Sequence, residues 1–245
     1  MVCYTWLNIE RGNEERYTSL VVAAKVKVCM VYNFSRISYT DALELQRRLH
    51  SQTVSGEIDA ALVLLEHDPV ITVGVRGTSS NILADPETLK RLGVEVVPID
   101  RGGDVTFHGP GQLVGYPIVK LGDVGQDVHV YLRALEQTII DTLSEFGIAG
   151  YRNPPAGVWA NGKKICSIGI AIRRRVAYHG FALNVNPDMS FFSLINPCGL
   201  NATVMTSMAQ LLPKAPSIDQ VKQIYIGKFA QVFGYKPEPR AEVVC

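Results

Sequence analysis

Cys198 is the residue whose type and setting best suit nucleophilic chemistry, because it lies between a proline and a glycine in the segment NPCG. Proline and glycine favour a turn, so we expect the thiol at an accessible position rather than inside a helix or strand. A nucleophilic thiol needs access and a lowered pKa, and a nearby base or cation provides the second. No neighbour of Cys198 in the sequence is such a group. Lys164 and His179 are the candidate partners from elsewhere in the chain, and spacing does not choose between them.

The glycine-rich segment RGGDVTFHGPGQ, residues 101–112, holds four of the 21 glycines of the chain. Glycine lets the main chain approach a ligand closely, and Arg101, Thr106 and His108 add polar groups beside that backbone. The segment lacks the Gly-Lys-Ser/Thr ending of a phosphate loop and the G-x-G-x-x-G pattern of dinucleotide-binding folds. It is therefore a candidate ligand-binding loop of another kind, or an ordinary tight loop.

Residues 164–169 follow Asn161-Gly162, a pair typical of a hairpin turn. In a regular strand Lys164, Cys166 and Ile168 would share one face, and the residues between them the other. Lysines after a turn are commonly solvated, and a cysteine in an apolar strand is commonly a small core residue.

The segment HGFALNVN, residues 179–186, alternates polar and apolar residues. That period is typical of a half-buried strand. A single histidine at such a position, here His179, is more often structural than catalytic.

The composition is that of a globular protein that can bury a sizeable core. The 245 residues are 47% hydrophobic and 19% charged, and the net charge is +1. A dedicated nucleic-acid binder usually carries a larger basic excess, so we expect a protein partner or a largely neutral small molecule instead. The near-neutral composition also favours a monomer.

The five cysteines are odd in number and widely spaced, and no CxxC occurs. They suggest neither a disulfide framework nor a zinc site, so we expect no metal. Free thiols indicate a reducing compartment, the cytoplasm.

The N-terminal region contains an apolar run, residues 20–32, which two lysines interrupt. It is too short to span a bilayer, and it follows a charged stretch rather than a signal-peptide pattern. We expect no membrane association. We expect residues 1–29 to be a start-site artefact or a loose extension, residues 30–234 to form the functional domain, and residues 235–245 to be a coil tail.

Helices and strands are mixed without a regular strand–helix–strand rhythm. Apolar residues at helical spacing predict helices at 38–50, 86–92, 127–146 and 217–233, the last with a capping box of Ser217 and Gln220. Strands are predicted at 61–65, 70–75, 94–99, 158–160, 164–172 and 176–185, and residues 101–117 are expected to be a loop followed by a strand. Hairpins in the middle of the chain favour an α+β sheet with helices packed on one side.

Four stretches taken together resemble the lipoyl(octanoyl) transferases of lipoate biosynthesis. They are RGGDVTFHGPGQLVGYPI, GVWANGKKICSIGIAIRR, YHGFALNV and INPCG, and the likeness runs from about Met30 to Phe233. The resemblance implies the biotin/lipoate protein ligase-like α+β fold, with a mixed, mostly antiparallel sheet and helices packed against it.

The resemblance also implies a reaction and its partners. An octanoyl group would pass from acyl carrier protein to a specific lysine of lipoyl domains, with no cofactor. The acceptors would be the glycine-cleavage H protein and the acyltransferase subunits of 2-oxoacid dehydrogenases. Because the donor is itself a thioester and the product is an amide, no ATP is needed.

The family's site residues carry over by position. Cys198 matches the acyl-thioester nucleophile, and Lys164 matches the lysine that lowers its pKa and acts as acid and base. The segments that would wall the acyl substrate match Arg101, Gly102, Gly103, Asp104, Val105, Thr106, Phe107, His108, Ser167, Ile168, Gly169, Gly180, Phe181 and Ala182.

Two alternatives remain from the sequence. One is an ATP-dependent lipoate–protein ligase of the same fold, which would need no nucleophilic cysteine and is therefore disfavoured by Cys198. The other is a non-catalytic module that binds an acyl group or a carrier protein, in which Cys198 is a structural thiol.

Overall fold

The structure is a computed structural model, and it describes residues 26–154, 156–196 and 202–241. Within these residues the strands form one eight-stranded sheet, in the order β11-β1-β2-β6-β10-β9-β8-β7, and one three-stranded sheet, in the order β4-β3-β5. The strands of the large sheet are β1 (Val28–Ile37), β2 (Ala60–His67), β6 (Gln112–Ile118), β7 (Gly150–Arg152), β8 (Gly157–Ala160), β9 (Lys163–Arg173), β10 (Val176–Asn184) and β11 (Lys236–Arg240).

The large sheet is mixed but mostly antiparallel. β1 lies parallel to both β2 and β11, and the remaining neighbouring pairs run antiparallel. The long hairpin of β9 and β10 forms its centre. The expected mixed, mostly antiparallel sheet is thus confirmed.

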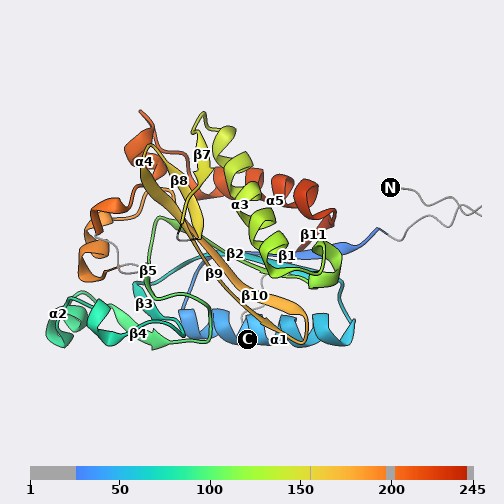
Figure 1. The fold of residues 1–245 in the computed structure, drawn as a ribbon, viewed down its shortest axis with the longest axis horizontal. Helices are drawn as coiled ribbons and strands as arrows, with labels where there is room; N and C mark the ends of the chain where they lie inside the picture. The colour runs from blue at the N-terminus through green and yellow to red at the C-terminus, as the bar shows by residue number, and fades with distance from the viewer. Residues whose placement is uncertain (1–25, 155, 197–201, 242–245) are drawn as a thin grey trace, which may run out of the picture.

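The small sheet closes one end of the molecule (Figure 1). In it β3 (Val70–Val73) pairs parallel with β4 (Glu95–Pro98) and antiparallel with β5 (Val105–His108). A separate apolar cluster around Ile71 and Phe107 packs here. The short helices of this region are α2 (Pro86–Arg91), η1 (Ser79–Asn81), η3 (Met189–Leu194) and η5 (Ala202–Val204).

The longer helices have the local signals that begin and end helices. The helices outside the small sheet are α1 (Tyr39–Ser55), η2 (Leu121–Val124), α3 (Val128–Ser144), α4 (Met208–Leu211) and α5 (Ile218–Phe233). The Ser38 side chain caps α1, which ends at Gly56 in the left-handed conformation that glycine adopts without strain. The predicted capping box of Ser217 and Gln220 opens α5 and is confirmed.

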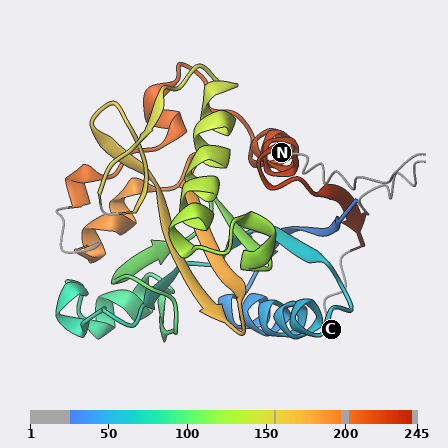
Figure 2. The ribbon, with the colours of Figure 1, turned by 45° about the vertical axis from the view of Figure 1, so that its right-hand side comes forward.

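Helices cover both faces of the large sheet (Figures 1 and 2). Along β2, Leu62 and Leu64 pack into the core beneath α3 and α5, whereas Val63 and Leu65 pack into the core beneath α1. The expectation that the helices lie on one side was therefore wrong. A strand segment that is buried on both faces is apolar without interruption, as residues 60–65 of β2 are.

Both ends of the expected domain need correction. β1 begins at Val28, and Cys29 is fully buried in the core, so these two residues belong to the sheet rather than to a loose extension. Residues 236–240 are not coil but the edge strand β11, which pairs with β1 from Val28 to Tyr32. The sequence patterns had suggested neither strand.

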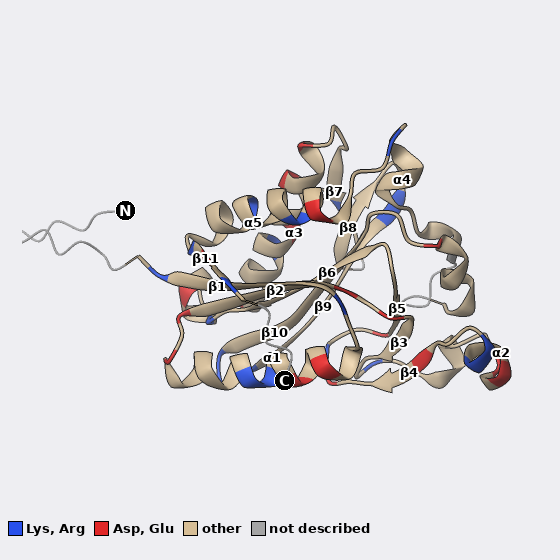
Figure 3. Ribbon diagram, turned by 180° about the vertical axis from the view of Figure 1, so that it is seen from behind, with Lys and Arg blue, Asp and Glu red and all other residues tan. Residues whose placement is uncertain are grey.

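Charged residues lie mainly on the helices, turns and strand ends, and the middle of the large sheet is almost free of them (Figure 3). Most charges therefore stay in water, while the strands supply the apolar core. No helix in the described part of the chain is long and apolar enough to cross a membrane.

Candidate active site

A cavity lies where the small sheet meets β6, β9, β10 and the start of α1, and it holds about 650 Å³ of space, its open mouth included. The largely apolar walls suit a small-molecule group. The segments expected to wall the acyl substrate meet here, and thirteen of the predicted site residues line the cavity: Arg101, Gly102, Gly103, Val105, Thr106, His108, Lys164, Ser167, Ile168, Gly169, Gly180, Phe181 and Ala182.

Asp104 and Phe107 do not line this cavity. The Asp104 carboxylate accepts a hydrogen bond from the Asn81 side chain at 2.5 Å. Phe107 points into the small-sheet core and stacks on Phe191, with ring centroids 4.9 Å apart. Both residues therefore stabilise the loop through contacts outside the cavity.

Lys164 reaches the cavity because β9 contains a bulge. Trp159 of β8 pairs with Lys164 and Val158 pairs with Cys166, which leaves Ile165 as an extra residue. An extra residue turns the side chains after it to the opposite face. Lys164 and Ser167 consequently both line the cavity, while Ile165 and Cys166 both pack in the core. The expectation that Lys164 and Cys166 share a face was wrong for this reason.

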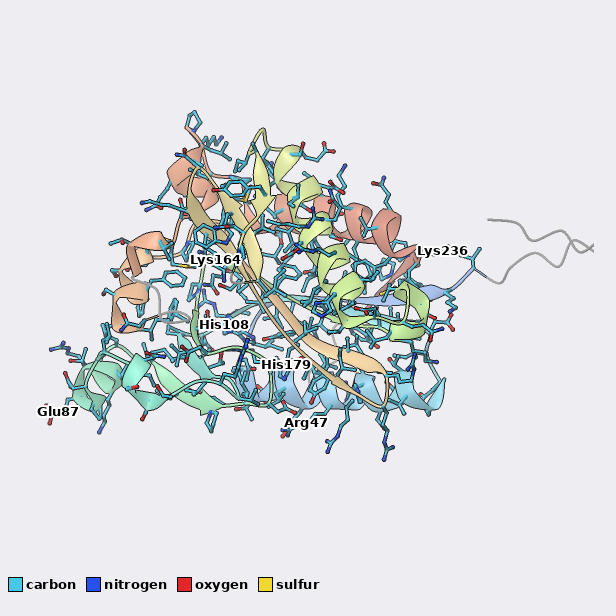
Figure 4. The ribbon with its side chains drawn as sticks, viewed as in Figure 1. Arg47, Glu87, His108, Lys164, His179 and Lys236 are labelled. Atoms are coloured by element: carbon cyan, nitrogen blue, oxygen red, sulfur yellow. The ribbon has the colours of Figure 1, made fainter. Side chains whose placement is uncertain are left out.

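The Lys164 amine is held inside the protein. The residue is only 4% exposed, and its Nζ donates a hydrogen bond to the Ala156 carbonyl oxygen at 3.0 Å. By contrast, the neighbouring Lys163 is exposed. Figure 4 shows Lys164, His108 and His179 in the middle of the molecule, whereas Arg47 and Glu87 lie at its outside.

Arg101 joins the glycine-rich loop to the small sheet. Its guanidinium Nη2 donates to the backbone oxygen and the hydroxyl of Thr72 at 3.0 and 2.9 Å, and its Nη1 donates to the Gly102 oxygen. The backbone N–H of Gly102 in turn donates to the Ile170 oxygen of β9 at 2.8 Å. The arginine therefore fixes one cavity wall against another.

Two glycines of the cavity wall allow very close main-chain contacts. A Cβ on Gly180 would stand 2.1 Å from the Gly115 oxygen, and one on Gly169 would stand 3.0 Å from the Gly102 oxygen. The first distance is shorter than a carbon–oxygen contact allows, and the second is so tight that the neighbouring backbone would have to shift. The YHGF and CSIG segments thus need glycine for packing as well as for access.

A cluster of aromatic and imidazole rings adjoins the cavity, and Tyr39, His108 and Tyr116 of this cluster line it. The His108 ring stacks on Tyr39 at 6.2 Å, and His67 hydrogen-bonds the Tyr116 hydroxyl at 2.7 Å. Burial lowers the pKa of His67 to about 4, although the Ile37 carbonyl opposes this shift. Burial, with the charge of Arg101 among the further causes, holds the pKa of His108 well below its usual value.

The predicted nucleophile, Cys198, lies outside the described residues. The chain is anchored on both sides of residues 197–201: Asn196 donates its N–H to the Asn81 oxygen at 2.8 Å, and Thr206 donates its N–H to the Lys164 oxygen at 2.9 Å. Met205 also forms a bridge with Lys164. The described residues that precede and follow this segment are therefore held at Asn81 and at the cavity lysine, respectively.

The two cysteines that the structure describes are poor nucleophiles. Cys29 and Cys166 are fully buried, and burial raises the pKa of both thiols. For Cys166 the positive charge of Lys164 opposes this shift without overcoming it. Among the described residues, no group of three or more His, Cys, Asp or Glu side chains could hold a metal ion.

Four further residues line the cavity that the sequence patterns did not assign to it: Tyr39, Tyr116, Val204 and Met205. His179, a candidate partner of Cys198 from the sequence, lines it as well. Tyr39 follows the helix cap and Tyr116 lies in a buried strand, so both looked like ordinary core residues. Val204 and Met205 follow the NPCG segment closely, and that proximity was the one available signal.

Comparison with known proteins shows the family. The model of the lipoyl protein ligase A/B catalytic domain matches residues 38–230. An octanoyltransferase of Solibacter usitatus is 47% identical over 218 residues, covering 89% of this chain and 98% of that one. An octanoyltransferase of Caldicellulosiruptor saccharolyticus is 46% identical over 215 residues, covering 86% and 90%.

Solved structures show the fold. A lipoate-protein ligase A bound with ATP superposes with a TM-score of 0.74 at 16% identity, covering 89% of this chain and 90% of that one. A putative lipoate protein ligase from T. acidophilum with bound lipoic acid gives 0.69 at 15% identity, covering 89% and 90%. The expected biotin/lipoate protein ligase-like fold is thus confirmed. The chain belongs to the lipoyl protein ligase A/B catalytic domain family and is an enzyme of the lipoyl(octanoyl) transferase type.

Proposed function

We propose that this chain transfers an octanoyl group from octanoyl-acyl carrier protein to a specific lysine of lipoyl domains, through a thioester on Cys198. The observation that carries the proposal is Lys164. Its buried amine opens onto a largely apolar cavity, and the chain returning from the NPCG segment is bonded to its backbone. The choice of octanoyl as the acyl group rests on the relatives, which are named octanoyltransferases.

The first step exchanges one thioester for another. Cys198 gives its proton to Lys164, and the thiolate attacks the thioester carbonyl of the donor. The bond to the carrier's sulfur breaks, and Lys164 returns the proton to that leaving thiolate. A free thiol with a pKa near 8.5 is only slightly ionised at neutral pH, so a neighbouring lysine increases the reactive fraction directly.

The second step forms an amide. The acceptor amine attacks the octanoyl-Cys198 carbonyl, the carbon–sulfur bond breaks, and its electron pair goes to the Cys198 sulfur. The step releases one proton from the amine, for which Lys164 is one acceptor. Because a thioester is converted to an amide, the reaction is downhill without ATP.

The cavity walls suit the acyl chain. Ile168, Phe181 and Met205 provide apolar surface, and the glycines bring backbone close to the space between them. Burying an alkyl chain contributes about 0.8 kcal/mol per methylene. The proposed acceptors are the glycine-cleavage H protein and the acyltransferase subunits of 2-oxoacid dehydrogenases.

The test is the intact mass of the protein after incubation with octanoyl-acyl carrier protein, without ATP. We expect one octanoyl adduct that hydroxylamine removes, because hydroxylamine cleaves thioesters. Cys198→Ser should lose this labile adduct, whereas Cys166→Ala, at a buried thiol, should keep it.

Each alternative makes a different prediction in the same experiment. An ATP-dependent ligase would form no adduct with the carrier protein, and it would modify lipoyl domains only with ATP and free acid. A binding module would form no adduct and would bind equally well after Cys198→Ser. Either result would overturn the proposal.

A further inference from the structure

His179 has an unusual backbone conformation for a histidine within a strand. Its φ is 56°, in the left-handed region, although it pairs with Ile170 in the β9–β10 hairpin. A non-glycine residue in this conformation is strained by about 1–3 kcal/mol, and such residues cluster at functional sites. The neighbouring structure holds it there, because the Gln46 side chain accepts a hydrogen bond from the His179 N–H at 3.0 Å.

The conformation directs two successive side chains to the same side of the strand. In a regular strand Tyr178 and His179 would point to opposite faces. Their ring centroids are instead 4.7 Å apart, and both rings bond the carboxylate of Asp100. The His179 Nε2 lies 2.9 Å from the Asp100 Oδ1.

The Asp100 bond determines which ring nitrogen carries the hydrogen. Partial burial raises the pKa of Asp100, but hydrogen bonds from Tyr178 and His179 outweigh it and lower that pKa. An ionised carboxylate only accepts hydrogen bonds. The hydrogen of neutral His179 therefore lies on Nε2, and Nδ1 presents a lone pair.

The lone pair of Nδ1 is the feature that the proposed mechanism leaves unused. His179 lines the cavity and is 1% exposed, and its Nδ1 has no hydrogen-bond partner among the described residues. A buried acceptor without a partner is costly. The group that would satisfy the Nδ1 lone pair is an N–H donor of a molecule that enters the cavity.

The charges around His179 keep its imidazole neutral and able to accept a proton. Burial lowers its pKa, the Asp100 carboxylate opposes this, and the positive charges of Arg101 and Arg47 lower it further. His108 also lines the cavity and interacts electrostatically with His179, and Tyr178 adjoins it on β10.

We propose that Nδ1 of His179 takes the proton of the acceptor lysine's amine as that amine displaces Cys198 from the octanoyl thioester. This role rests on the proposed function. The amine nitrogen bonds to the octanoyl carbon, the carbon–sulfur pair goes to the Cys198 sulfur, and the amine proton goes to Nδ1. Lys164 then serves the first step, and His179 serves the second.

Asp100 stabilises the positive charge that the proton brings to His179. The imidazolium formed on His179 lies beside the carboxylate at 2.9 Å, as in other carboxylate–histidine pairs. The Asp100 side chain is 54% exposed, while that of His179 is 1% exposed. The carboxylate thus orients and stabilises the buried ring without itself becoming protonated.

The test separates the two steps. Octanoyl-enzyme is formed from octanoyl-acyl carrier protein and followed by intact mass, and an unmodified lipoyl domain is then added. His179→Gln keeps an N–H near the position of Nε2 but has no atom that replaces Nδ1. We expect this variant to form octanoyl-enzyme at the wild-type rate and to transfer it about 100-fold more slowly or worse, the usual effect of losing a general base.

Two further variants control for folding and for the loss of a ring. His179→Asn tolerates the left-handed backbone and carries an amide that is not basic, so transfer should again be slow. His50→Gln removes an imidazole that contacts Tyr178 but does not line the cavity, and both steps should be unchanged.

Two results would overturn the inference. One is transfer from octanoylated His179→Gln at the wild-type rate. The other is an equal loss in both steps, which would indicate a structural role. If the wild-type protein forms no octanoyl-enzyme at all, the proposed function itself fails, and this outcome is separate from both.

Discussion

Lys163, Lys164 and Cys166 show how one extra residue assigns three neighbouring side chains to different surroundings. Lys163 is exposed, Lys164 faces the cavity, and Cys166 packs in the core. The bulge at Ile165 causes the separation. A strand without it would have placed the lysine amine and the core thiol on the same face.

Replacing Lys164 should therefore abolish the first step, while replacing Lys163 should not. Lys164→Ala removes the only lysine amine among the described residues that line the cavity, and we expect octanoyl-enzyme formation to slow about 100-fold or more. Lys163→Ala is the matched control, one residue away and exposed. Intact-mass time courses measure both. An unchanged rate in Lys164→Ala would exclude this lysine from the chemistry.

Gly180 should be intolerant of even one methyl group. In Gly180→Ala the added Cβ would meet the Gly115 oxygen at 2.1 Å, and overpacking of this kind destabilises by about 1–3 kcal/mol or more. Gly227→Ala, in α5, meets nothing within 4 Å and should stabilise by up to about 1 kcal/mol. Denaturant unfolding compares the two variants, and equal stability would refute the packing argument.

At this scale the sequence identified most of the cavity residues but not their orientation. The resemblance to the transferase family led to Ser167, Gly169 and Gly180, whose motifs the chain shares. The sequence could not predict to which face of the sheet the Lys164 side chain points, because the bulge that decides this depends on the pairing of β8 with β9. The left-handed His179 could not be predicted either, because Gln46 and Asp100 come from distant segments.

β1 and β11 illustrate the same limit for whole elements. β11 contains Pro237 and Pro239, which cannot donate ladder hydrogen bonds and are typical of coil or of edge strands. Its position at the edge of the sheet accommodates both prolines. The residues of β1 continue the apolar run that precedes them in the sequence, so the sequence alone did not show where the strand begins. The helices were predicted well, because their caps are local signals.

A chain that begins at Met30 should be less stable than one that begins at Val26. The shorter chain loses the buried Cys29, the bond from the Val28 N–H to Asp59, and the bond from the Lys236 N–H to the Lys27 oxygen. We expect a loss of about 2 kcal/mol or more. The midpoints of urea unfolding measure this loss, provided that the two chains show the same dependence of unfolding free energy on urea concentration. Identical midpoints would mean that residues 26–29 are dispensable after all.

Over the whole molecule, two cores enclose the large sheet, and the cavity lies at its junction with the small sheet. The α+β class was predictable from the mixture of hairpins and helices. The cover on both faces was signalled by the unbroken apolar run of residues 61–65, which an alternating, half-exposed strand would not contain. The cavity itself depends on segments that meet only in the fold.

Three buried imidazoles at this junction should make the protein less stable in mild acid. Burial lowers the pKa of His67, His108 and His179. The unfolded chain therefore binds more protons as the pH falls from about 6.5. Above about pH 6.5 these three groups should not change the free energy of unfolding. Below that pH the free energy of unfolding should decrease as the pH falls towards about 4, the pKa of His67.

Variants identify the source of this pH dependence. His67→Gln should flatten the decrease in unfolding free energy, while His129→Gln, at an exposed position of α3, should not. Urea unfolding across the pH range gives the slopes. A His67→Gln profile parallel to that of the wild type would show that this ring does not contribute.

The most direct test of the central claim is a chase of isolated octanoyl-enzyme. Protein carrying a radiolabelled octanoyl group from the carrier protein is freed of donor and mixed with an unmodified lipoyl domain, without ATP. The account predicts that the label leaves Cys198 and appears as an amide on one lysine of the lipoyl domain, mole for mole. Label that remains on the chain, or that moves only when ATP is added, would contradict a transferase working through Cys198.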